Sequence, residues 1–228
     1  MPDLSPDDLS VLTQWDTPTI CNALEIVIPE RRGHGFTVEP LVCLDPSLPP
    51  IVGYARTATI RAAAPPTDAP DRMRYYEYVA SGAAPTVVVI QDLDPAPGVG
   101  AFWGEVNTAV HKGLGAAGVV TNGSFRDLPD SAPGFQVLAG RVGPSHAHVH
   151  VVAFQVPVIV HGMAVHHDDI IHADRHGAVV IPKDAVVRIP QAVELISRRE
   201  AVVLKAARSP DFDIEKLKAA TAGAKDVH

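Results

Sequence analysis

The sequence contains little cysteine and no cluster of basic residues. Cys21 and Cys43 are its only cysteines, which are too few for a disulfide framework and are not placed in a metal-binding spacing. The 19 lysine and arginine residues are outnumbered by 26 aspartate and glutamate residues, so the net charge is −7. Nucleic-acid binding depends on basic side chains that neutralise phosphates. The composition therefore argues against nucleic acid as a partner.

Long apolar segments are also missing. No run approaches the roughly 20 apolar residues that a membrane-spanning helix needs, and the N-terminal segment is acidic, unlike a signal peptide. We therefore expect a cytoplasmic protein without a membrane partner. Its 228 residues are enough to bury a substantial core, as one large domain or two small ones.

Short apolar segments alternate with helical patterns along the chain. Helices are expected to begin at Asp16 or Thr17, before Pro18, and at Asp71. Amphipathic helical spacing returns from Lys183 onward. This alternation predicts an α/β fold. Strands are expected over 53–62, where alternation indicates half-burial, and over 86–90, 116–121, 136–139 and 178–181, with a hairpin or a strand pair over 149–160.

Two features in the middle of the chain indicate a ligand site. Gly104 and Glu105 are expected where a helix begins, and the free backbone N–H groups of a helix start favour an anion. Asn122-Gly123 is expected to end the strand over 116–121, because both residues tolerate positive φ. The end of that strand is then a place for ligand-binding side chains, as in other open α/β sheets.

Charged side chains follow directly after this expected strand end. Arg126 offers a cation, and Asp127 and Asp130 offer the oxygen ligands that magnesium and manganese prefer. A bare Arg-Asp pair is usually only a surface ion pair. Its combination with the expected strand end and with the upstream helix start favours a binding site.

The spacing of these residues resembles that of a known enzyme family. Gly104-Glu105 is followed after twenty residues by Arg126-Asp127, with Asp130 three residues further on. This pattern is similar to that of the 4-hydroxy-4-methyl-2-oxoglutarate aldolases, class II pyruvate aldolases that also decarboxylate oxaloacetate and share a fold with the regulator of ribonuclease E activity A. The resemblance covers about residues 10–200 and includes the segments 16–24, 53–58, 160–174 and 177–182.

The resemblance implies an α/β fold of the swivelling β/β/α type, in which a mixed sheet core is flanked by helices. It implies a single domain over residues 1–228, with a core over about 10–205 and a helical tail over 206–228. Members of the family are usually trimers or dimers of trimers with sites at the subunit interfaces. We therefore expect a homo-oligomer.

The same resemblance implies a divalent-metal-dependent carbon–carbon lyase that acts on a small 2-oxo acid. The expected reactions are retro-aldol cleavage and oxaloacetate decarboxylation, both of which give pyruvate. Asp127 is the expected ligand for Mg²⁺ or Mn²⁺, with Glu105 acting directly or through bound water. Arg126 would hold the oxygen on which the enolate charge develops.

The remaining groups are expected to hold the substrate and to move a proton. The family's general base is a carboxylate from the C-terminal helix of a neighbouring subunit, which Glu194 or Glu200 would supply here. Backbone N–H groups of the predicted helix start would bind the substrate carboxylate, and the residues concerned are Gly104, Glu105, Val106 and Asn107.

Two departures from the family pattern and a group of histidines leave other functions open. The aldolases usually carry Asp where Glu105 stands, and commonly Asp-Gly where Asn122-Gly123 stands. A non-catalytic, protein-binding regulator is therefore one alternative. His146, His148 and His150 alternate, so on a strand they would share one face. They would then be either a solvated strand face or a zinc site in a different lyase subgroup.

Overall fold

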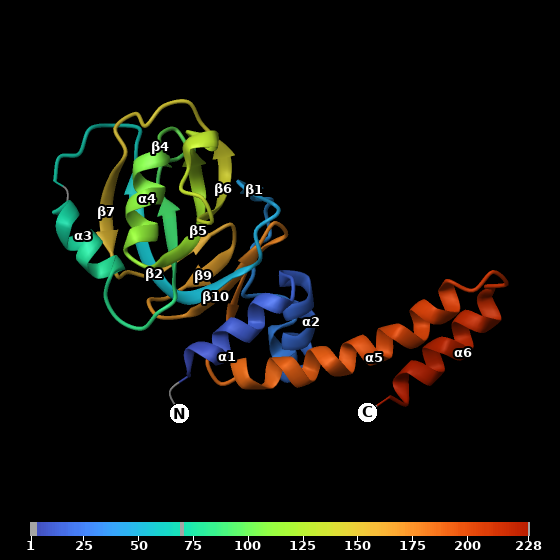
Figure 1. The fold of residues 1–228 in the computed structure, drawn as a ribbon. Coiled ribbons are helices and arrows are strands. Elements are labelled where there is room, and N and C mark those ends of the chain that lie inside the picture. The colour runs from blue at the N-terminus through green and yellow to red at the C-terminus, as the bar shows by residue number, and fades with distance from the viewer. Residues whose placement is uncertain (1–3, 69–70, 228) are drawn as a thin grey trace.

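A computed structural model describes residues 4–68 and 71–227. Within these ranges a nine-stranded mixed sheet lies at the centre of the molecule, in the order β1-β6-β5-β3-β2-β10-β11, with β4 beside β5 and β7 beside β2 (Figure 1). The strands β8 (Val158–Val160) and β9 (Met163–Val165) form a separate hairpin. The sheet strands are β1 (Val42–Cys43), β2 (Ile51–Arg61), β3 (Thr86–Asp92), β4 (Ala101–Trp103), β5 (Ala116–Phe125), β6 (Gln136–Val142), β7 (His150–Phe154), β10 (Ile170–Asp174) and β11 (Gly177–Ile181).

The central strands of the sheet share one direction. β2, β3, β5 and β6 are parallel to one another, whereas β1, β7, β10 and β11 join the sheet in antiparallel pairs. The carboxyl ends of β2, β3, β5 and β6 therefore meet at one edge. This edge is where an open α/β sheet places its ligands.

Helices lie against the face of the sheet that is turned to the viewer in Figure 1 and below the sheet. α3 (Arg72–Val79) and α4 (Glu105–Gly113) lie against one face, while α1 (Pro6–Ser10) and α2 (Thr17–Val27) lie below the sheet (Figure 1). Both predicted helix starts are confirmed: the Asp16 carboxylate accepts the Thr19 N–H at 2.9 Å, and the Asp71 carboxylate accepts the Met73 N–H at 2.9 Å. The predicted α/β fold, with a mixed sheet core flanked by helices, is confirmed.

Burial along β2 differs from the half-buried strand that was predicted. Every residue from Ile51 to Ile60 is buried, and only Arg61 is exposed. Ala58 and Ile60 pack in the core beneath α3 and α4, whereas Ile51 and Ala55 pack against the β8–β9 hairpin on the opposite face. A strand that is covered on both faces has no solvated side, so its polar-apolar alternation does not report exposure.

The strand β5 also differs from its prediction, because Asn122-Gly123 does not end it. The strand continues to Phe125, and its register against β6 shifts between Thr121 and Ser124. The Asn122 side chain takes over the pairing at this point: its Oδ1 accepts the Asp92 N–H at 2.7 Å, and its Nδ2 donates to the Asp92 carbonyl at 3.0 Å. The amide thus acts as a substitute for backbone pairing with β3.

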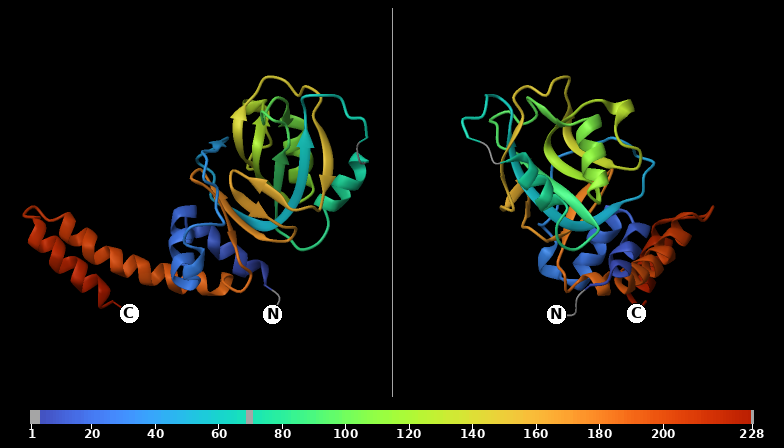
Figure 2. Two further views of the ribbon diagram at one scale, coloured as in Figure 1. Left: turned by 180° about the vertical axis from the view of Figure 1, so that it is seen from behind. Right: turned by 60° about the vertical axis from the view of Figure 1, so that its left-hand side comes forward.

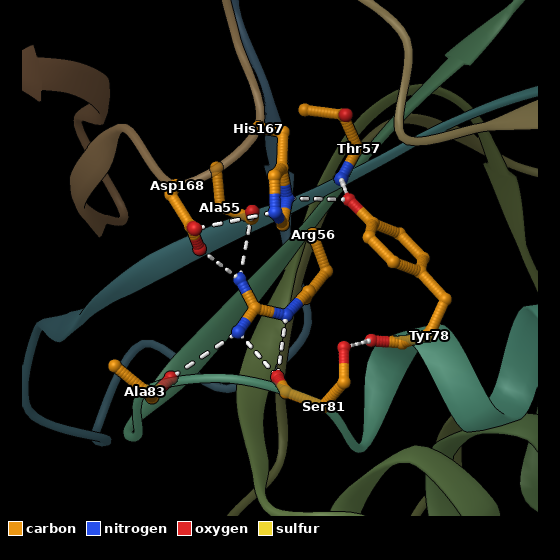
Figure 3. A network of polar contacts seen from close by, with 8 residues as sticks. All are labelled: Ala55, Arg56, Thr57, Tyr78, Ser81, Ala83, His167 and Asp168. Atoms are coloured by element: carbon orange, nitrogen blue, oxygen red, sulfur yellow. Dashed lines mark hydrogen bonds and ion pairs between the residues drawn. The ribbon is translucent and has the colours of Figure 1, made fainter.

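Arg56 of β2 is fully buried, and its guanidinium is ion-paired and hydrogen-bonded inside the protein (Figure 3). Its Nε donates to the Ser81 carbonyl at 3.0 Å, and its Nη2 donates to the Ala83 carbonyl at 3.3 Å. Its Nη1 pairs with the Asp168 carboxylate at 2.5 Å, which also lies 3.2 Å from Nε2 of His167. These contacts tie the segment between α3 and β3 to the segment between β9 and β10. Arg56 therefore serves the fold.

The C-terminal helices extend away from the sheet. α5 (Ile189–Ala207) buries Ile189, Ala192 and Val193 near its start, where it packs against α2. Its later turns pair with α6 (Ile214–Lys225) and form a two-helix arm (Figures 1 and 2). The helical pattern predicted from Lys183 onward is confirmed. None of the helices in the described ranges combines the length and the apolar character needed to span a bilayer.

Candidate active site

Strand pairing brings the two predicted site segments together. Trp103 of β4 is the pairing partner of Phe125 at the end of β5, and the Arg126 N–H donates to the Trp103 carbonyl at 2.9 Å. Gly104 then caps the start of α4, as predicted. The Gly104-Glu105 and Arg126-Asp127 segments therefore lie side by side at the carboxyl edge of the parallel strands.

The Asp127 carboxylate lies over the first turn of α4. Its Oδ2 accepts the Glu105 N–H at 3.3 Å, and a Cβ added to Gly104 would be only 2.6 Å from this oxygen. Gly104 has an extended backbone (φ −165°) that any residue adopts, so space rather than conformation requires glycine here. The positive end of the helix dipole favours a carboxylate at this position.

Arg126 and Asp127 form an ion pair that remains open to solvent. Arg126 Nη1 lies 3.1 Å from Asp127 Oδ1, and the two side chains are 38% and 29% exposed. Asp127 adopts a left-handed backbone (φ 54°), which is strained for a residue with a side chain. This turn directs the chain from β5 into the 3₁₀ turn Leu128–Asp130. The guanidinium and the carboxylate both keep surface available to a ligand.

The start of α4 offers backbone donors beside this pair. Glu105 is exposed, and the side chain of Val106 is 71% exposed. The N–H groups of the first helical turn have no acceptor within the helix. The Glu105 N–H contacts Asp127, which leaves the N–H groups of Val106 and Asn107 as the donors for an anionic ligand.

The side chain of Asn107 holds the helix in place instead of facing a ligand. Its Oδ1 accepts the Tyr76 hydroxyl at 3.1 Å, and its Nδ2 donates to the Phe102 carbonyl. One turn later, His111 Nδ1 lies 2.6 Å from the Asn107 carbonyl and Nε2 lies 2.9 Å from the Tyr75 hydroxyl. Because a carbonyl only accepts, Nδ1 carries the proton and Nε2 accepts from Tyr75. Burial lowers the pKa of His111 to about 4, so the ring is neutral near neutral pH.

Sequence reasoning missed this layer of support beneath the site. The spacing of Asn107 and His111 by four residues on a predicted helix was the available signal, since such residues share a face. Asp92 was missed as well. Its carboxylate is buried and accepts the N–H groups of Asp94 at 2.9 Å and Gly98 at 2.7 Å, which orders the loop leading into β4. Burial raises the pKa of this carboxyl.

The acidic residues fit a hard divalent cation that keeps several water ligands. Such an ion is commonly held by only one or two carboxylates. Asp127 offers one partly exposed carboxylate here, and Glu105 is exposed on the adjacent first turn of α4. Within residues 4–68 and 71–227, no three His, Cys, Asp or Glu side chains are grouped closely enough to hold a metal on their own. The donor set therefore suits Mg²⁺ or Mn²⁺ better than a three-ligand zinc site.

The histidine group does not have the geometry that was predicted. Residues 146–149 lie outside any strand, Ala147 has φ 43°, and β7 begins only at His150. His146, His148 and His150 therefore do not share one strand face, and that prediction was wrong. Their Nδ1 contacts are local: His146 bonds to the Ala147 carbonyl and His150 to the His148 carbonyl, both at 2.7 Å.

The two candidate bases both lie on α5. Glu194 and Glu200 are exposed on α5, and α5 is at the opposite end of the molecule from the start of α4 (Figures 1 and 2). A role for either residue therefore requires a second copy.

Comparisons with known proteins relate the chain to one family. The family model RraA-like, described as Aldolase/RraA, matches residues 17–180. No protein among those with curated functions matches the sequence.

Solved structures give the same picture of the fold. An uncharacterized protein from Pseudomonas syringae pv. tomato strain DC3000 has a TM-score of 0.72 at 19% identity, with 97% of this chain and 96% of that chain covered. Streptomyces coelicolor RraAS2, described as an unusual member of the RNase ES inhibitor RraA protein family, has a TM-score of 0.69 at 22% identity, with 92% and 100% covered. The RNA-processing inhibitor RraA from Thermus thermophilis has a TM-score of 0.50 at 20% identity, with 70% and 90% covered. At such identities these similarities establish the fold.

Proposed function

The chain belongs to the RraA-like family, and from this premise we propose that it is a divalent-metal-dependent carbon–carbon lyase acting on a small 2-oxo acid. The observation that carries the proposal is the placement of Arg126, Asp127 and the start of α4 at one point of the sheet edge. This arrangement offers a cation, a metal ligand and backbone donors to one small anion. The proposed substrates are 4-hydroxy-4-methyl-2-oxoglutarate, related compounds and oxaloacetate, each of which would yield pyruvate.

The roles of the side chains follow from the charges of the substrate. The N–H groups of Val106 and Asn107 bind the substrate carboxylate at the positive end of α4. The guanidinium of Arg126 donates to the keto oxygen, and these hydrogen bonds strengthen as that oxygen gains enolate charge. Arginine suits this position because its planar donors are already oriented.

The metal site would be built on Asp127, with Glu105 binding directly or through water. A divalent cation held there would supply Lewis-acid polarisation of the keto group. Gly104 contributes by leaving room for the Asp127 carboxylate, whose Oδ2 lies only 2.6 Å from the position that a Cβ would take. The Glu105 N–H holds that carboxylate in place.

A second copy of the chain is part of the proposal. Val106 and Leu128 flank the site with side chains that are 71% and 44% exposed, which indicates apolar surface for a neighbouring subunit to cover. The general base, which removes the hydroxyl proton in retro-aldol cleavage, would then be Glu194 or Glu200 of that copy. We propose a trimer or a dimer of trimers as the active assembly.

The test measures pyruvate release, coupled to lactate dehydrogenase, from oxaloacetate and from 4-hydroxy-4-methyl-2-oxoglutarate. Oxaloacetate also decays without protein, and faster with free metal, so protein-free controls with the same metal are subtracted. We expect turnover with Mg²⁺ or Mn²⁺ that EDTA abolishes and that Asp127→Ala lacks. Asp184→Asn is the matched control, because Asp184 is an exposed member of another Arg-Asp pair. Unchanged turnover in metal-stripped Asp127→Ala would refute the proposal.

A protein-binding regulator is the second candidate function. It is favoured by the fold that the chain shares with proteins described as inhibitors of RNA processing or of RNase ES. It predicts no turnover above the protein-free control with either substrate, together with inhibition of a ribonuclease on direct addition of this protein. Metal-dependent turnover that requires Asp127 would favour the lyase instead.

A further inference from the structure

A cavity opens at the same sheet edge, outside the candidate active site. It measures about 390 Å³ and lies where β2 ends and β7 begins, with residues 63–68 forming part of its lining. Its polar lining comes from Arg61, Thr67, Asp68, Asp94 and His150. None of the residues assigned to the proposed lyase chemistry lines it. The cavity is therefore a separate feature that the proposed function does not use.

Arg61 and His150 lie opposite each other on the adjacent strands β2 and β7. They are direct partners in the antiparallel register of β2 and β7, and directly opposed residues in such a pair have neighbouring side chains on one face. An anion held by the Arg61 guanidinium would therefore lie beside the imidazole of His150.

The Arg61 guanidinium has unused hydrogen-bonding capacity. Its side chain is 49% exposed, and its Nη1 lies 3.7 Å from Asp94 Oδ1, which is too long for a hydrogen bond. In the part of the chain that the structure describes, no acceptor is hydrogen-bonded to this guanidinium. Asp94 is already committed, because its Oδ2 accepts the N–H groups of Ala62 at 2.7 Å and Ala63 at 2.8 Å.

The imidazole of His150 is oriented by its own loop. Its Nδ1 lies 2.7 Å from the His148 carbonyl, and because that carbonyl accepts, Nδ1 carries a proton. Nε2 is therefore the ring nitrogen available to a ligand. The remaining lining is largely apolar and comes from Pro65, Pro66, Pro95 and Val152.

From this juxtaposition we infer that the cavity binds the carboxylate or phosphate group of a small molecule between Arg61 and His150. Arg61 recognises two oxygens of the group with its forked donors. Because Nδ1 of His150 carries the ring proton, Nε2 accepts a hydrogen bond from a hydroxyl of the bound molecule. The apolar lining receives the rest of the molecule. Asp68 is the acidic residue at the exposed rim, and its charge opposes the anion.

Binding is tested in the full-length chain carrying Arg126→Ala, from which metal has been removed with EDTA followed by dialysis, so that neither Arg126 nor a bound metal contributes at the candidate active site. Inorganic phosphate and malonate are titrated separately by isothermal calorimetry at constant ionic strength. We expect saturable binding of at least one of them, with one ion per chain. Binding of phosphate alone identifies a phosphate ester as the ligand class, and binding of malonate alone identifies a carboxylic acid.

Three further substitutions in that chain test the residues. Arg61→Ala is expected to weaken binding on the order of tenfold or more, as for loss of a charge-assisted hydrogen bond. Asp68→Asn is expected to strengthen it, because a like charge is removed. His146→Ala changes a residue in the loop before β7 that does not line the cavity. This variant is expected to bind the ion as tightly as its parent. The inference is overturned if neither ion binds, or if Arg61→Ala binds as tightly as its parent while thermal melting shows both to be folded.

Discussion

Two arginine–aspartate pairs in this protein have opposite roles. Arg56 is completely buried, and backbone carbonyls and Asp168 accept its hydrogen bonds (Figure 3). Arg126 is 38% exposed and has one contact at 3.1 Å, to Asp127. A cation whose donors are all occupied can only hold the fold together. A cation with free donors at a strand end is able to bind a ligand.

The largest effect is expected from Arg126→Ala. This variant should lower the rate of pyruvate release about 10²–10³-fold, because a donor to a developing oxyanion is removed. Its free energy of unfolding should change by no more than about 0.5 kcal/mol, since the side chain is at the surface. Arg188→Ala is the matched control, because Arg188 forms a similarly exposed pair at 3.4 Å and should retain full activity. Equal loss in both variants would remove the distinction between the two surface pairs.

The buried pair should show the reverse pattern. Arg56→Ala is expected to lower the free energy of unfolding on the order of 3 kcal/mol, because it leaves carbonyls and Asp168 without their buried partner. Arg61→Ala, on the same strand but half-exposed, should cost less than about 0.5 kcal/mol. Urea denaturation of both variants measures the difference. A small effect of Arg56→Ala would mean that water replaces the guanidinium without cost.

Gly104→Ala tests the exposed pair of Arg126 and Asp127. Its new Cβ would lie 2.6 Å from Asp127 Oδ2 and 3.3 Å from Arg126 Cγ, so both side chains must move. We expect pyruvate release to fall on the order of tenfold, because small displacements of catalytic groups are costly. Gly113→Ala in the same helix meets nothing within 4 Å and should leave the rate unchanged. Equal rates in all three proteins would show that the Asp127 position is not critical.

The smallest expected effect is a change in stability due to His111, the buried histidine beneath the Arg126–Asp127 pair. Burial lowers the pKa of His111 to about 4 in the folded protein, compared with about 6.5 in the unfolded chain. The unfolded state therefore binds more protons between these values, and the contribution to stability is lost as the pH falls through this window. From pH 7.5 to pH 5.5 the loss attributable to His111 is about 1 kcal/mol.

The check on His111 is a set of urea denaturation curves at both pH values for the wild type and for His111→Gln. Glutamine offers a donor and an acceptor without titrating. The variant should lose less stability than the wild type over this range. Parallel losses in the two proteins would assign the pH dependence to other groups, such as His172, whose pKa is also lowered by burial.

Local chemistry explains why some elements were predictable. The caps of α2 and α3 depend on Asp16 and Asp71, whose carboxylates bond to N–H groups three and two residues away. Such contacts need no partner from elsewhere in the chain. The start of α4 at Gly104 has no such side-chain cap, and the site segments were predicted through a resemblance in spacing.

The errors arose where a distant strand or loop changed the outcome. Asn122 would end an isolated strand, but here its side chain pairs with Asp92, thirty residues away. β2 alternates like a half-buried strand, yet the β8–β9 hairpin covers its second face. His146 and His148 alternate like strand residues but lie in a turn before β7. The periodicity of polar and apolar residues in the sequence does not by itself predict these contacts.

The sequence by itself determined the helix caps, the α/β class and the set of charged residues after β5. Only the tertiary structure decided that Trp103 pairs with Phe125, that Asp127 occupies the space beside Gly104, and that Arg56 is buried while Arg126 is open. The physical reason is the separation along the sequence of the residues that interact. A cap is formed between residues a few positions apart, whereas the exposure of a charge depends on strands and loops that the rest of the chain places around it.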